Sequence, residues 1–251
     1  MSLPGPHTDR AGRTRDHRAR HHRWSRGMER LDWIRPKVLR HGPPTVVAAL
    51  ALALCPAPAF GAGGEVAKVA GAVITRHEFD HWIRIAAHSS AAQSSPVIVP
   101  TDPPRFNACI ADARRKIPSQ RKTPIRTLRA ACRQLFGSLE PGVLDFLIKN
   151  QWYRDRAAAN GITMTARRVR QVFEADKRNR FSTSAQFKRF LKETDQTAAD
   201  ILFRVRASLV YAALLKAEHV SQRVLNAEVE REYRPQTICA RYYVTADCAG
   251  A

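Results

Sequence analysis

The chain has 251 residues, 44% of them hydrophobic, so it is long enough for one ordinary domain with a real core. It carries 42 Lys and Arg against 22 Asp and Glu, which gives a formal net charge of +20. That surplus favours anionic partners but says nothing about the fold. The sequence contains no Gly-rich phosphate loop and no G-x-S-x-G motif, the signatures of nucleotide-binding and α/β-hydrolase enzymes.

Residues 1–59 have the pattern of a basic leader followed by a secretory signal peptide. Residues 1–44 hold eleven Lys and Arg, four acidic residues and no apolar period, so they cannot form a core. The uncharged run TVVAALALALC follows, and it is shorter than the ~20 residues of a membrane-spanning helix. Ala57 and Ala59 then supply the small-residue pattern of a signal cleavage site. We predict an exported, extracytoplasmic protein, either secreted or in the cell envelope.

Two alternatives to this interpretation carry less weight. The chain could be a cytoplasmic protein with a basic arm, or a lipoprotein modified at Cys55. Leu54 disfavours lipidation, because lipoprotein processing requires a small residue at that place. Met28 offers a second start, from which the basic flank has an ordinary length.

Four cysteines follow the predicted cleavage site, and an even number in an exported chain indicates disulfides. Three pairings are possible. The local pairing fits best, because each pair then lies within one stretch of the chain. No C-x-x-C pattern of a zinc or redox site is present, so we expect two structural disulfides, Cys109–Cys132 and Cys239–Cys248.

In the first half of the mature chain, residues 65–75 are predicted to form a short strand, a turn at Gly71 and a second extended piece. Thr75 then begins a helix over 76–88, with Glu78 three residues later in a capping box. A Ser/Pro-rich connection follows. The spacing next predicts helices over 105–116, 125–136 and 140–160, with a break at Gly137.

The second half is predicted to be helical as well. Thr165 begins a helix over 166–181, a short one follows over 184–194, and Thr197 with Asp200 begins a long one over 197–219. A last helix covers 226–233. The fold class is therefore mainly α, with one short N-terminal β-strand or hairpin.

Residues 76–82, RHEFDHW, contain His77-Glu78-x-x-His81, which has the letters of a zinc-protease motif. A third ligand is missing at the usual spacings, because Arg84 and Ala87 stand where metzincins have Gly and His. The apolar residues of this helix recur at i, i+3, i+4 and i+7, which places both histidines on the opposite, solvated face. We judge the match fortuitous and predict no catalytic residue, metal or cofactor.

Three stretches, taken in order, resemble the N-terminal chaperone domain of the SurA/PrsA group of extracytoplasmic foldases, which is similar to the helical arm of trigger factor. They are VAKVAGAVITRHEFDHWI, AAANGITMTARRVRQVFEADK and FSTSAQFKRFLKETDQTAADILFRVRASLVYAALL. Ala70 stands where that group has Asn, and Asp195 where it has Gly. The resemblance implies a SurA-N-like helical domain at 60–235 with a Cys-bearing helical insertion at 89–137, and then a short tail at 236–251.

The resemblance implies binding of unfolded or nascent exported polypeptides. In this group the last helix leads into a parvulin prolyl isomerase domain, and only sixteen residues follow Pro235. We therefore expect a chaperone-like module without its own catalytic domain. The alternatives are a prolyl isomerase by family membership, and a basic structural protein associated with the wall or membrane. An anionic envelope surface is a second expected partner, and nucleic acid is disfavoured by export.

Overall fold

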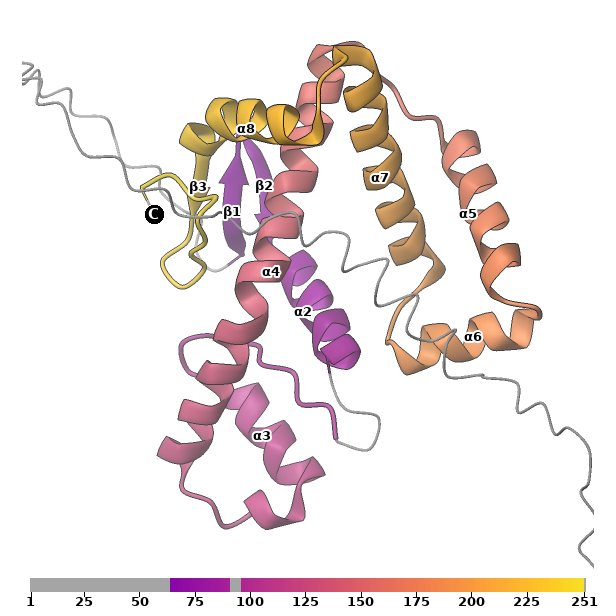
Figure 1. Ribbon diagram of the computed structural model, residues 1–251. Helices are drawn as coiled ribbons and strands as arrows, with labels where there is room; N and C mark the ends of the chain where they lie inside the picture. The colour runs from indigo at the N-terminus through magenta and orange to yellow at the C-terminus, as the bar shows by residue number, and fades with distance from the viewer. Residues whose placement is uncertain (1–63, 91–95, 251) are drawn as a thin grey trace, which may run out of the picture. The chain divides into compact units, whose positions relative to one another are not determined.

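The computed structural model describes residues 64–90 and 96–250, which form seven α-helices and a small three-stranded sheet (Figure 1). The mainly α fold class with a short strand region is confirmed. The predicted signal peptide, the cleavage residues Ala57 and Ala59, and the second start at Met28 lie outside the described residues.

The sheet begins with a hairpin of β1 (Glu65–Val69) and β2 (Ala72–Thr75), which pair antiparallel. Its two-residue turn, Ala70–Gly71, has positive φ at both positions, 46° and 94°. β3 (Thr237–Cys239) pairs antiparallel with the other edge of β1, so the strand order is β2-β1-β3. The sequence did not predict this third strand, because a three-residue strand carries too short a pattern and forms only by pairing with distant β1.

α2 (Arg76–Ser90) continues directly from β2. The Glu78 backbone N–H donates to Thr75 Oγ1 at 3.1 Å, as expected of a capped first turn. The buried face includes Phe79, Trp82 and Ile83, as the spacing predicts. This short segment therefore anchors the N-terminal hairpin to the helical core.

The prediction of two helices over 125–136 and 140–160 is wrong, because α4 (Ile125–Ala159) is one helix of 35 residues. It runs through Gly137 and Pro141 without a break. A glycine in a helix costs only about 1 kcal/mol, and Phe136, Val143 and Leu144 are buried on either side of the expected break. Burial of that shared face holds the two halves in line.

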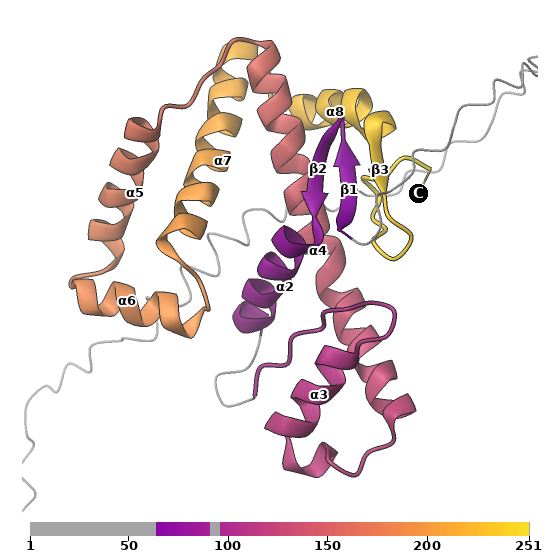
Figure 2. The ribbon, with the colours of Figure 1, turned by 180° about the vertical axis from the view of Figure 1, so that it is seen from behind.

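α3 (Asn107–Lys116) and η2 (Pro118–Gln120) precede α4, and α3 packs on its first turns. The Cys109 and Cys132 sulfurs lie 2.01 Å apart, so the expected disulfide joins α3 to α4. In both views α3 lies beside the N-terminal half of α4, and α7 beside its C-terminal half (Figures 1 and 2).

The remaining helices are α5 (Ala166–Arg180), α6 (Ser184–Glu193), α7 (Ala198–Glu218) and α8 (Gln222–Tyr233), followed by η3 (Arg234–Gln236). The residue before each of these four α-helices has a hydroxyl side chain that accepts a hydrogen bond from a backbone N–H in the first turn. These residues are Thr165, Thr183, Thr197 and Ser221. The Thr197–Asp200 capping box predicted from the sequence is present.

The core gathers around α4, which contacts the sheet, α2, α7 and α8. The buried Trp152 Nε1–H donates to Thr237 Oγ1 at 2.8 Å, which ties α4 to β3. The Cys239 and Cys248 sulfurs are 2.08 Å apart and close the tail into a short loop. Within residues 64–90 and 96–250 no helix combines the length and apolar character needed to cross a bilayer.

Candidate functional site

The residues of the zinc-like motif lie in the first two turns of α2 but do not act together. His77 is exposed, whereas Glu78 is half-buried and its backbone is held by Thr75. Burial raises the pKa of Glu78, although Arg154 and His81 oppose the rise. In the part of the chain that the structure describes, no three His, Cys, Asp or Glu side chains are grouped to hold a metal ion.

The prediction that His81 faces solvent is wrong. Its Nε2 lies 2.7 Å from Asp200 Oδ1, and the two side chains are 29% and 10% exposed. The first turns of α7 pack against this face of α2, where Asp195 also lies 3.9 Å from His88 and from Arg84. The periodicity of one helix cannot show that a second helix will cover its polar face.

A separate site is formed by α5 and α6, which together we call the arm (residues 166–193). α5 buries Val169 and Phe173 and packs on α7. The chain turns between α4 and α5 at Gly161, two residues after the end of α4, where φ is +65°. Among the described residues the arm's buried side chains, Val169 and Phe173, lie outside the main core cluster, so the arm has its own small apolar contact.

α6 is strongly amphipathic, yet none of its residues is buried. Phe187, Phe190 and Leu191 recur at i, i+3 and i+4, and all three stay partly exposed. Phe181 packs its ring 5.3 Å from that of Phe187 and 5.4 Å from that of Phe190. Phe173 of α5 lies 5.9 Å from Phe187. We call these four rings the phenyl cluster.

A lysine of α5 lies against the phenyl cluster. Lys177 Nζ lies 5.4 Å from the centre of the Phe173 ring and 5.5 Å from that of Phe187, within the range of a cation–π contact. The acids of α5 are already paired, Glu174 with Lys177 at 2.8 Å and Asp176 with Arg180 at 2.6 Å. The arm therefore keeps uncompensated positive charge beside partly exposed rings.

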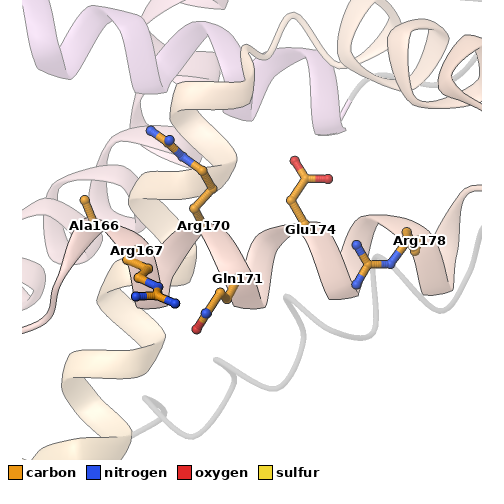
Figure 3. Close-up of a pocket in the computed structure, with 6 residues that line it drawn as sticks. All are labelled: Ala166, Arg167, Arg170, Gln171, Glu174 and Arg178. Atoms are coloured by element: carbon orange, nitrogen blue, oxygen red, sulfur yellow. The ribbon is translucent and has the colours of Figure 1, made fainter.

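α5 also carries a shallow hollow along its outer surface. All of its described lining residues belong to this one helix, as Figure 3 shows; they are Ala166, Arg167, Arg170, Gln171, Glu174 and Arg178. Arg167, Arg170 and Arg178 are exposed and form no ion pair with any residue that the structure describes. Such a surface attracts carboxylates and phosphates.

The sequence did not single out the phenyl cluster as a site. Its pattern is visible in residues 184–194, where the apolar spacing is clear, but an apolar stripe on a helix ordinarily marks the core. Only the packed structure separates a stripe that is buried from one that is left partly exposed.

No protein-family model matches the chain, and comparison with curated proteins and with solved structures found no similar protein. The chain's own residues therefore carry the functional argument. Its two disulfides are typical of proteins that fold in an oxidising, extracytoplasmic environment.

Proposed function

We propose that the chain is an exported chaperone-like module that binds unfolded polypeptides through the arm. The observation that carries this proposal is α6, an amphipathic helix whose apolar face is left partly exposed beside the phenyl cluster. Contiguous apolar surface that stays accessible on a folded protein often marks a site that binds a partner. Unfolded chains expose apolar side chains that such a face can cover.

The cations of the arm affect which client segments it binds. Residues 166–193 contain nine Lys and Arg against three Asp and Glu. Long-range attraction by this rim raises the rate of encounter with acidic segments, while the rings supply contact area. The expected clients are thus apolar segments flanked by acidic residues.

Two backbone positions support the resemblance to the SurA/PrsA group. Ala70 and Asp195 both adopt left-handed conformations, with φ of 46° and 50°. They stand where that group has Asn and Gly, the residues that adopt this conformation most easily. The backbone geometry expected of the resemblance is thus present although the residue types differ.

Light scattering of a chemically denatured acidic model protein, diluted into buffer with increasing amounts of the chain, tests the proposal. We expect the chain to suppress aggregation, and a double variant, Phe187→Ser with Phe190→Ser, to need about fivefold more protein for the same suppression. The matched control changes two exposed apolar residues elsewhere, Val224→Ser with Val244→Ser, and should behave as wild type.

Circular dichroism and thermal unfolding of both variants separate loss of binding from loss of fold. Equal suppression by the α6 variant and the wild type would refute binding through the arm. A prolyl-peptide isomerisation assay addresses the alternative function. Catalysis by the purified chain would refute a purely chaperone-like module.

A further inference from the structure

The positive charge of residues 64–251 is concentrated in two places. Residues 105–133 contain nine Lys and Arg but only one acid, Asp112, and the arm holds nine against three. In the rest of residues 64–251, 13 Lys and Arg stand beside 14 Asp and Glu. The charge surplus therefore belongs to two local surfaces, and only one of them is the proposed client site.

We call residues 105–133 the basic hairpin; it comprises α3, η2 and the first turns of α4. Its single acid, Asp112, forms ion pairs with Arg115 and, at 2.8 Å, with Lys116, so it does not neutralise the other cations. Among its remaining cations, Arg121, Lys122, Arg126 and Arg133 are exposed and pair with no acid among the described residues. These four leave the hairpin with an uncompensated positive surface.

An apolar side chain lies among those cations. Ile125, the first residue of α4, is 49% exposed, next to Arg126 and three residues after Lys122. Large aliphatic side chains at this exposure are few in the described chain, and the basic hairpin combines one with unpaired charge.

The basic hairpin presents these groups on a fixed scaffold. The Cys109–Cys132 disulfide joins its two helices, and Ile110 and Leu128 are buried between them. Arg114 also donates to the Thr123 carbonyl oxygen at 3.1 Å, which holds the connection between the helices. A surface that is already ordered loses less conformational freedom on binding than a flexible basic tail.

We propose that the basic hairpin docks on a lipid bilayer that carries anionic headgroups. The cations are opposite in charge to the headgroups, and Ile125 can enter the boundary between headgroups and acyl chains. Nucleic acid fits less well, because Phe106, the aromatic residue of the basic hairpin, is 2% exposed and offers no ring for base stacking. The proposal does not depend on client binding by the arm.

Hydrogen exchange gives a local test in the full chain. The probes are vesicles of neutral phosphatidylcholine and vesicles of the same lipid with one quarter anionic phosphatidylglycerol. We expect the anionic vesicles to slow amide exchange in residues 119–127, and the neutral vesicles to leave it unchanged. Protection of other segments alone, with none in residues 119–127, would overturn the proposal.

Charge variants give the second test, by flotation with the same vesicles. One variant converts Arg121, Lys122, Arg126 and Arg133 to Gln, and its matched control converts Arg167, Arg168, Arg170 and Arg178 of α5 to Gln. A cation near an anionic bilayer contributes roughly fivefold in binding, so we expect a loss on the order of 600-fold when all four are removed in the first variant. The control should lose less than about fivefold.

The remaining outcomes separate the sources of anionic charge. We expect Ile125→Ser to weaken vesicle binding about threefold or more, because the apolar side chain enters the bilayer. The same substitution should not change electrostatic binding to a soluble anionic polymer. Equal losses in the two four-residue variants would show general charge attraction and overturn a specific surface. Tighter binding to a DNA duplex than to anionic vesicles at the same salt concentration, lost in the basic-hairpin variant, would assign the surface to nucleic acid instead.

Discussion

At the scale of single residues, Asp200 joins two helices through its side chain. It accepts hydrogen bonds from the Thr197 backbone and hydroxyl at 2.7 Å each, and lies 2.7 Å from His81 Nε2. Burial alone would raise the pKa of Asp200, but these hydrogen bonds outweigh burial and lower it. A carboxylate whose pKa is lowered by folding stabilises the fold above its ordinary pKa, and that contribution is lost as the pH falls through the folded value.

We predict that Asp200→Ala lowers the free energy of unfolding by about 1–3 kcal/mol at pH 7. The difference between variant and wild type should shrink as the pH falls below 4, because Asp200 then takes up a proton in both the folded and unfolded wild type. Urea unfolding from pH 3 to pH 7 measures it. Thr197→Ser, which keeps the cap hydroxyl, is the control. A difference that does not vary with pH would contradict the ionic role.

Glu140 is a buried carboxyl of α4, only 6% exposed, and its Oε1 finds no hydrogen-bond partner in the described part of the chain. Burial raises the pKa of Glu140 to about 7, Asp145 adds to the rise, and a backbone hydrogen bond from Val244 opposes it. The protonated form therefore stabilises the fold below the ordinary value of 4.5, and this contribution is lost as the pH rises toward 7.

We predict that Glu140→Gln makes the chain more stable at pH 8 by about 1–2 kcal/mol and leaves its stability unchanged at pH 4. The neutral amide keeps the shape of the carboxyl without its buried charge. Chemical unfolding at the two pH values measures the effect. Equal stability of the two proteins at pH 8 would show that the Glu140 carboxylate is solvated in the fold.

At the scale of elements, the turn of the β1–β2 hairpin contains a residue that does not favour the backbone conformation it adopts. Two-residue hairpin turns with positive φ at both positions favour Asn-Gly, and this chain has Ala70-Gly71. Alanine in the left-handed region costs about 1 kcal/mol, whereas asparagine adopts it more easily. Apart from its chain neighbours, no heavy atom lies within 4 Å of a Cβ atom placed on the neighbouring Gly71. Backbone conformation, and not steric crowding, therefore limits which residues fit this turn.

We predict that Ala70→Asn stabilises the fold by about 0.5–1 kcal/mol and that Gly71→Ala destabilises it by a similar amount or more. Both follow from the cost of positive φ in residues with a side chain. Thermal unfolding of the two variants measures them. Destabilisation by Ala70→Asn would indicate that the turn changes conformation in solution.

At the scale of the whole molecule, the core, the proposed apolar binding surface and the charged surface lie in different parts of the described chain. The core gathers around α4, the phenyl cluster lies on the arm, and the basic hairpin carries charge without exposed aromatic rings. Because the two surfaces use different residues, their variants should affect client protection and vesicle binding separately. The tests proposed for the arm and for the basic hairpin are therefore independent of each other.

The sequence alone determined the features that depend on neighbouring residues. The caps at Thr165 and Thr197, the apolar face of Phe79, Trp82 and Ile83, and the local pairing of the cysteines all follow from short spacings. These signals depend on geometry within a few turns of one helix, or on cysteines close in the chain, so no knowledge of distant segments was needed.

Only the tertiary structure decided the features that depend on a distant neighbour. Packing of a shared face carried α4 through Gly137 and Pro141, pairing with β1 made a strand of Thr237–Cys239, and α7 covered His81 with Asp200. The same holds for the phenyl cluster, because an apolar stripe becomes either core or binding surface according to what packs on it. Local spacing specifies which face of an element is apolar, and long-range packing decides whether that face is buried.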